Sequence, residues 1–294
     1  MKKMTRKKSK AAKPPLQSKG LRQGKEKTEM YIAPLFSGSS GNCLLAEAGG
    51  TRLLIDAGKP ARTIEEGLGE FGLSLKDIQG LLITHEHTDH IAGAGVLARK
   101  YRIPIYANAA TWQAMENAIG KVPPGCRREF ETGRDFYIGD INILPFPTPH
   151  DAAESVGYCL FYGGRKLTVM TDIGHMTEGL YGAAAGSDLL LIEANHDPEL
   201  VSSSRYPYPL KRRILSDKGH LSNENCGRAL CRLYRSGVRG AILGHLSREN
   251  NFEQLALETV RSELEKEQIS REEFGLWVAH RDGVTGRFAV EEEE

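Results

Sequence analysis

The chain lacks the features of a secreted or membrane protein. No hydrophobic stretch approaches the roughly 18 residues that a membrane-spanning helix requires, and the N-terminus has no apolar core of a secretory signal. The five cysteines are odd in number and include no C-x-x-C pair, so they make a poor disulfide framework. Reduced thiols suit the cytosol, so we expect a cytoplasmic protein without a membrane partner.

The chain also has almost no net charge, but its charges are unevenly distributed. The formal charge of the whole chain is +1, whereas residues 1–29 hold eleven Lys or Arg against two Glu. Residues 30–294 therefore carry about −8. Because the basic segment has few large apolar side chains, we expect residues 1–29 to be a disordered tail before a globular domain at 30–294. Whether the tail binds nucleic acid or only solubilises the protein stays open.

From residue 30 onward, apolar strand patterns alternate with helical spacing and no long linker intervenes. The expected strands are residues 31–36, 43–47, 51–55, 80–84, 104–107, 136–147, 156–162, 166–171, 188–193 and 240–243. The expected helices are residues 60–71, 91–101, 109–119, 222–236 and 252–267. Gly163-Gly164 predicts a hairpin. The pattern indicates an α/β (α+β) protein in which a layered sheet sandwich is flanked by helices.

Three histidines and an aspartate follow the apolar strand that ends near Thr84. Histidine is the commonest metal donor among side chains, and a carboxylate suits divalent cations. His85 and His87 lie on one side of an extended segment, so they can bind one ion together. Asp89 and His90 follow a turn and point more naturally to a second ion. The motif predicts a metal-binding protein.

Three further strands end in a possible ligand: His150, Asp172 and His245. A strand end is a rigid position, which a site with several ligands needs. Each motif is weak alone, because a single histidine after a strand is often a surface residue. Taken in order with the first motif, they complete two sets of metal ligands.

The order H-x-H-x-D-H, His, Asp, His resembles the metallo-β-lactamase superfamily over nearly all of residues 30–290. The resemblance implies an αββα sandwich, and thus a metallo-β-lactamase-like hydrolase domain at 30–294. It also implies two divalent metal ions, Zn²⁺ or Mn²⁺, that activate a hydroxide. The first ion would be bound by His85, His87 and His150, and the second by Asp89, His90 and His245. Asp172 would bridge them, where the true lactamases have a cysteine.

Two segments indicate phosphodiester chemistry. In the phosphodiesterase branch of the superfamily, a Glu-Ala and a Gly-His-x-Ser segment supply a proton relay, and here they correspond to Glu193 and His220. We therefore take Asp89, Glu193 and His220 as the candidate catalytic residues, with the last two protonating the leaving oxygen. The alternative for His220 is a structural place beside the helix cap Ser222. His196 could instead bond to a metal ligand.

The chain lacks two nucleic-acid attachments of its relatives. Asp172 and His245 are 73 positions apart, too few for the extra domain of β-CASP enzymes, and His150 and Asp172 are 22 apart, too few for a tRNA-binding arm. Together with segments 37–42, 193–197, 219–223 and 244–251, this compact plan resembles the YycJ family, also called WalJ or VicX. The family implies a DNA 5′→3′ exonuclease linked to DNA repair, which favours DNA over RNA as the substrate.

Two other segments fit a nucleic-acid substrate without requiring it. Residues 205–213 combine cations with tyrosines that could stack on a base, or they form a solvated loop. The Ser/Gly turn at 37–42 could bind phosphate or simply close a hairpin. Asp56 is expected to support a ligand, while His175 and His280 are expected to be structural.

Other functions stay open. The same metals and proton relay would suit a small-molecule or cyclic-nucleotide phosphodiesterase, or an RNA-processing nuclease. A thioester or lactone hydrolase would not need Glu193 and His220, and a regulatory protein would use its metals only structurally. The oligomeric state is not predicted by these motifs.

Overall fold

Residues 29–291 are described by the computed structural model, and within them two sheets of seven strands pack face to face. The first sheet has the order β14-β1-β2-β3-β4-β5-β6. Its strands are β1 (Met30–Phe36), β2 (Cys43–Ala48), β3 (Thr51–Ile55), β4 (Gly80–Leu82), β5 (Ile105–Ala107), β6 (Arg127–Glu129) and β14 (Phe288–Ala289).

The second sheet has the order β13-β12-β11-β10-β9-β8-β7. Its strands are β7 (Phe136–Ile138), β8 (Ile141–Pro147), β9 (Val156–Tyr162), β10 (Arg165–Met170), β11 (Leu189–Glu193), β12 (Gly240–Gly244) and β13 (Gly275–Val278). Gly163 and Gly164 join β9 to β10 with φ of 57° and 82°, as the predicted hairpin requires.

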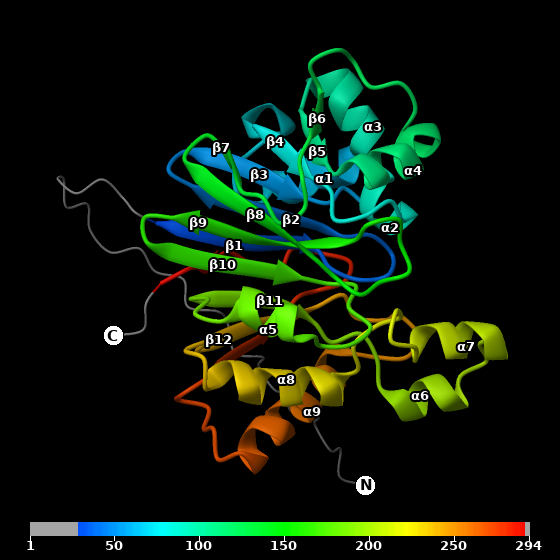
Figure 1. Ribbon diagram of the computed structural model, residues 1–294, viewed down its shortest axis with the longest axis vertical. Helices are drawn as coiled ribbons and strands as arrows, with labels where there is room; N and C mark the ends of the chain where they lie inside the picture. The colour runs from blue at the N-terminus through cyan, green and yellow to red at the C-terminus, as the bar shows by residue number, and fades with distance from the viewer. Residues whose placement is uncertain (1–28, 292–294) are drawn as a thin grey trace, which may run out of the picture.

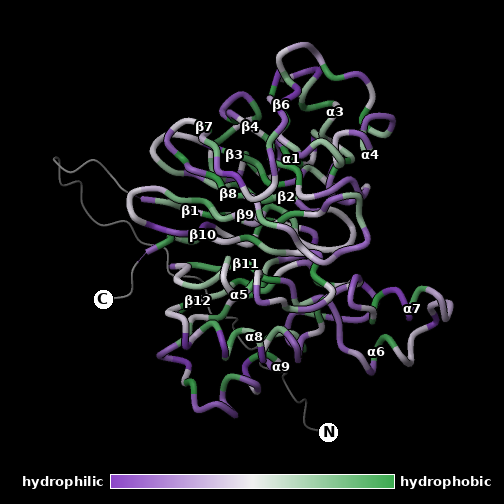
Figure 2. The backbone as a smooth tube through the Cα atoms, in the orientation of Figure 1, coloured by the Kyte–Doolittle hydropathy of each residue, from purple (hydrophilic) through white to green (hydrophobic). Residues whose placement is uncertain are grey.

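Helices cover both outer faces (Figure 1). The first sheet packs against α1 (Ala61–Gly69), α2 (Thr88–Ile91), α3 (Ala94–Val96), η2 (Leu97–Tyr101) and α4 (Ala109–Ile119), with η1 (Leu75–Asp77) at its side. The second packs against α5 (Glu178–Ala184), α8 (Asn223–Tyr234) and α9 (Glu253–Lys266). Figure 2 shows hydrophobic residues gathered along the strands and hydrophilic residues at many of the turns. The predicted αββα sandwich is confirmed.

Two short helices stand apart from the layers. Helices α6 (Pro198–Ser203) and α7 (Tyr208–Ile214) project from one end of the sandwich in Figure 1, between β11 and α8 along the chain. The sequence did not predict these helices, nor α5 and strands β6, β13 and β14. Each is short, and prolines interrupt the segment of α6 and α7, so no periodic pattern builds up.

The strand directions place the site. Strands β3 to β6 run parallel, as do β10 to β13, while the strands before them pair antiparallel. The carboxyl ends of parallel strands meet at one edge of each sheet, where ligands bind in such folds. Side chains that follow these strands therefore gather at one end of the sandwich.

One predicted helix is wrong in detail. Instead of a continuous helix at 91–101, the chain forms two short α-helical pieces and a turn of π-helix. A side chain at Gly93 would lie 2.4 Å from the Lys59 carbonyl oxygen, and one at Gly95 would lie 2.0 Å from that of Ile119. The backbone thus approaches its neighbours closely at both glycines, which favours packing over regular helix geometry.

The expected tail at 1–29 lies outside the described residues, except for its last position. Within the part of the chain that the structure describes, none of the helices combines the length and apolarity needed to cross a bilayer.

Candidate metal centre and catalytic pair

The predicted metal ligands all lie at one end of the sandwich. His85, His87, Asp89 and His90 follow β4 of the first sheet, whereas the loops after β8, β10 and β12 of the second sheet supply His150, Asp172 and His245. The site is therefore built across the two sheets.

A first cluster joins His85, His87 and His150, whose ring nitrogens lie within 4.8 Å of one another. His150 Nε2 and His87 Nδ1 are 3.4 Å apart. His85 and His150 are buried and His87 is half-buried. Burial and the neighbouring imidazoles hold the pKa of His85 well below its ordinary value, so the ring is neutral, as a metal ligand must be.

A second cluster joins Asp89, His90 and His245. The Oδ2 atom of Asp89 lies 3.6 Å from His90 Nε2 and 3.7 Å from His245 Nε2. Asp172 lies between the clusters: its Oδ1 is 3.6 Å from both His150 Nε2 and His245 Nε2, and its Oδ2 is 3.4 Å from His90 Nε2. This position between the clusters is the one that the sequence predicts for a bridging carboxylate.

The donor atoms fit divalent cations. Nδ1 of three buried histidines is hydrogen-bonded to a group outside the clusters. His90 donates to Asp56 (2.7 Å), His150 to the Gly219 carbonyl (3.1 Å) and His245 to Glu193 (2.7 Å). Such outer bonds fix the ring and direct Nε2 to the other ligands, although Nε2 of His90 also lies 3.2 Å from Asn42 Nδ2. Three inward atoms are buried without a hydrogen-bond partner in the described residues: His85 Nε2, His245 Nε2 and Asp172 Oδ2. Unpartnered buried polar atoms are costly, and cations would satisfy them.

Backbone conformation marks the same positions. Asp56, Asp172 and His245 have φ of 62°, 56° and 56°, in the left-handed region that non-glycine residues rarely adopt. Asp56 and His245 follow directly on a strand of a parallel ladder, and Asp172 comes one residue after such a strand. Such conformations cost free energy and persist where the surroundings impose them, often at functional sites.

Glu193 and His220 form the expected pair. His220 Nδ1 donates to Glu193 Oε1 at 2.8 Å, and the same oxygen accepts from His245 Nδ1. The other oxygen accepts from the backbone amides of Ile173 and Leu221. Burial alone would raise the pKa of Glu193, but His220 and His245 bring it below the ordinary value, so the carboxylate is ionised. With both oxygens engaged, Glu193 orients histidines and is poorly placed to bind a metal, although its donor atoms lie near those of Asp172.

The supporting role expected of Asp56 is borne out by its contacts. Its Oδ1 accepts from the Thr84 amide at 2.9 Å while its Oδ2 bonds His90. His175 bonds the Asp217 carbonyl and His280 bonds Glu253, both at the surface. Nδ1 of His196 has no hydrogen-bond partner in the described residues, so no bond from it to a metal ligand is seen. Ser222 caps α8 by accepting from Asn225, and this does not displace His220 from Glu193.

The Ser/Gly turn at 37–42 supports the ligands. The Gly38 amide donates to Asn42 Oδ1, the Gly41 amide to the Gly38 carbonyl and the Asn42 amide to the Asp89 carbonyl. Ser37 Oγ accepts from the His245 amide at 2.9 Å. The turn therefore contacts the segments that carry Asp89 and His245.

Sequence reasoning missed several supporting residues. Asn195 Nδ2 donates to the His245 carbonyl at 2.7 Å. Asp151, next to His150, is held by Arg213 through Nε and Nη2, the latter at 2.9 Å. Asn195 could have been noticed within the segment 193–197, but nothing in the sequence links Asp151 with a residue 62 positions away.

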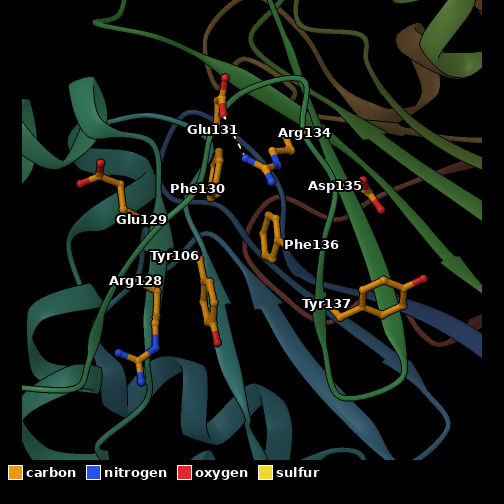
Figure 3. Close-up of a pocket in the computed structure, with 9 residues that line it drawn as sticks. All are labelled: Tyr106, Arg128, Glu129, Phe130, Glu131, Arg134, Asp135, Phe136 and Tyr137. Atoms are coloured by element: carbon orange, nitrogen blue, oxygen red, sulfur yellow. Dashed lines mark ion pairs between the residues drawn. The ribbon is translucent and has the colours of Figure 1, made fainter.

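A cavity of about 500 Å³ opens elsewhere, between the edges β6 and β7 of the two sheets. Figure 3 shows the rings of Tyr106, Phe130 and Phe136 lying side by side, with an Arg134–Glu131 ion pair above them. None of the predicted site residues lines it. The predicted site residues therefore lie outside this hollow.

Comparison with known proteins agrees with this geometry. Residues 51–246 match the β-lactamase superfamily domain. The chain belongs to the β-lactamase superfamily. Exodeoxyribonuclease YycJ of Bacillus anthracis is 40% identical over 81% of this chain and 90% of its own length, and exodeoxyribonuclease WalJ of Streptococcus pneumoniae is 44% identical over 78% and 86%. This superfamily member is thus of the YycJ and WalJ type.

Solved structures agree on the fold. The metallo-β-lactamase fold protein YhfI of Bacillus subtilis aligns with a TM-score of 0.66 at 16% identity, over 89% of this chain and 99% of its own. At that identity the likeness establishes the architecture alone. The predicted metallo-β-lactamase fold of this superfamily member is confirmed.

Proposed function

We propose that this protein is a metal-dependent exodeoxyribonuclease that digests DNA from the 5′ end. The observation that carries the proposal is the His220–Glu193 pair beside two ligand clusters, in a chain 40–44% identical to two proteins named exodeoxyribonuclease. A proton relay beside a two-cation site is what phosphodiester cleavage requires. We propose two ions, Zn²⁺ or Mn²⁺, with Asp172 between them, because imidazole and carboxylate donors accept either metal.

Protein side chains supply the remaining steps of the proposed reaction. When bound, the cations would supply Lewis-acid activation of water and neutralise charge on the phosphate. Glu193 holds Nδ1–H of His220, which leaves Nε2 of this half-buried ring to carry the proton for the leaving oxygen. The ionised carboxylate also stabilises the protonated ring. Departure of the alkoxide is thereby assisted.

We place the activity in the cytoplasm, in DNA repair. All five cysteines are buried and free, which suits a reducing compartment. DNA is preferred over RNA as the substrate because the two relatives are named as exodeoxyribonucleases.

The test is digestion of single- and double-stranded DNA and RNA, labelled at either end, by protein loaded with Zn²⁺ or Mn²⁺. We expect stepwise release of nucleotides from 5′ ends of DNA, absent in Asp172→Ala. Digestion of RNA in preference to DNA, or release from 3′ ends, would overturn the assigned substrate or polarity.

Rival activities give different results in parallel assays. A small diester such as a cyclic nucleotide would be the only substrate if the protein were a small-molecule phosphodiesterase. A thioester or lactone hydrolase would act on those esters and keep its rate in His220→Ala. A regulatory metal protein would cleave none of these substrates.

A further inference from the structure

Helices α6 and α7 carry an exposed surface that the proposed reaction does not use. The chain leaves β11 after Glu193 and returns at His220, so this arm, residues 197–218, is inserted between the two members of the catalytic pair. It projects from the end of the sandwich that holds the ligands, which Figure 1 shows. Whatever binds the arm therefore lies beside the reaction centre.

The arm is anchored to the site. Arg213 binds Asp151, the neighbour of His150, and the Asp151 amide donates to the Lys218 carbonyl at 3.1 Å. Lys211 Nζ donates to the Ser202 carbonyl at 2.7 Å, which ties α7 to the end of α6. A surface held in this way keeps a fixed position relative to His150 and His220.

One face of α7 combines an aromatic ring, cations and an apolar side chain. Positions i, i+3, i+4 and i+7 of a helix share a face, and here they are Tyr208, Lys211, Arg212 and Leu215. Tyr208 is 72% exposed and Leu215 47% exposed, whereas Ile214 is buried toward the body. Large apolar side chains left in water next to cations indicate a surface that binds something.

The charge of the arm is opposite to that of its surroundings. Residues 197–218 contain five Lys or Arg against Asp197, Glu199 and Asp217, a net charge of about +2, in a domain whose remaining residues are strongly acidic in sum. Such a local reversal attracts a polyanion and repels acidic proteins. Arg and Lys bind phosphates, and an exposed tyrosine ring stacks on a nucleobase regardless of sequence.

We propose that the α6–α7 arm binds single-stranded DNA next to the scissile end, with Arg212 on a phosphate and Tyr208 stacked on a base. The proposal rests on the nuclease function and adds the surface that selects a polymer over a small diester. It requires an extended strand, because a free base can stack only when it is not paired.

The test measures binding and turnover in Tyr208→Ala and Arg212→Ala. The matched controls are Tyr137→Ala, a 67% exposed tyrosine at the cavity of Figure 3, and Arg62→Ala, a surface arginine of α1. Binding of a fluorescent single-stranded phosphorothioate oligonucleotide, which resists cleavage, is followed by anisotropy against salt. Turnover is compared between a DNA oligonucleotide and bis(p-nitrophenyl) phosphate.

We expect Tyr208→Ala to weaken binding roughly five- to a hundred-fold with the salt slope unchanged. Arg212→Ala should weaken it and reduce the slope by about 0.7, the value for one phosphate contact of a single strand. In both variants the ratio of kcat/KM for the oligonucleotide to that for the small diester should fall, and in the controls it should stay constant.

The outcomes separate the two proposals. If the wild type digests DNA but both arm variants keep the wild-type affinity and kcat/KM ratio, the proposed DNA-binding role of the arm is wrong. The proposed nuclease function is then unaffected. If DNA binding is weaker in Tyr137→Ala but not in Tyr208→Ala, the proposed role of the arm is also wrong, and a base stacks at the cavity of Figure 3 instead. If DNA binding depends on the arm but the wild type digests no DNA, the binding role of the arm is supported and the proposed nuclease function is wrong.

Discussion

Glu193 accepts hydrogen bonds from two histidines with different tasks. His220 is the proposed proton donor, and His245 is a proposed ligand of the second metal. A substitution at Glu193 would therefore disturb both proton transfer and metal binding. His220 is the better probe of proton transfer, because it is not among the predicted ligands of either metal.

At this scale we predict that His220→Ala lowers kcat on DNA by about 10²- to 10⁴-fold, the usual contribution of a general acid. The metal content, measured by plasma mass spectrometry, should equal that of the wild type. His280→Ala, which removes a surface histidine bonded to Glu253, is the matched control and should change neither quantity. Loss of metal in the His220 variant would instead make His220 a ligand.

A second residue-scale prediction concerns Asp56. Asp56→Asn replaces the charged acceptor of His90 Nδ1 with a neutral amide, which weakens the orientation of the ring. We expect the metal affinity of the weaker site to fall about 10- to 100-fold, measured by competition with a chelator. An unchanged affinity would show that Thr84 alone orients His90, since Thr84 Oγ1 lies 3.2 Å from the same nitrogen.

At the scale of elements, the loop after β3 packs against the metal motif. An added side chain at Gly58 would lie 1.7 Å from the Asp89 carbonyl oxygen, while the Gly58 amide donates to the Asn42 carbonyl. Any substitution must therefore displace the segment that carries Asp89 and His90. The loop therefore supports the segment that carries two predicted ligands.

We accordingly predict that Gly58→Ala lowers the metal content by about one ion per chain and reduces activity on DNA, with far-UV circular dichroism unchanged. Gly69→Ala is the control: it lies at the end of α1, has no atoms within 4 Å of the added carbon and should be neutral or slightly stabilising. Full metal occupancy in Gly58→Ala would mean that the two loops separate without cost to the site.

The secondary-structure elements also explain how much of the fold and of the candidate site could be predicted from the sequence. The clustering of the predicted ligands at 85–90, 150, 172 and 245 could be predicted because each follows an apolar strand, and strand ends converge by topology. The Asp151–Arg213 ion pair could not be predicted from the sequence, because it depends on how the arm packs against a loop 62 positions away. The broken helix at 91–101 was missed because close backbone contacts at Gly93 and Gly95 are tertiary.

At the scale of the whole molecule, the site joins the two sheets. The first sheet presents His85, His87, Asp89 and His90, and the second presents His150, Asp172 and His245. Bound cations would hold the sheets together at this end, while the apolar layer between them, which includes Ile55, Leu82, Val169 and Ile242, holds them along their length. Metal binding would thereby be coupled to the stability of the whole sandwich.

We therefore predict that metal removal lowers the melting temperature of the whole domain. A cation present at a hundred times its Kd stabilises the folded state by about 2.7 kcal/mol, which corresponds to roughly 5–10 °C for a domain of this size. Differential scanning calorimetry of metal-free and reloaded protein measures the shift. Asp172→Asn removes the negative charge that lies between the two clusters. The melting temperature of this variant should therefore rise less than that of the wild type when metal is added back. An equal melting temperature with and without metal would mean that the sheets are held by the apolar layer alone.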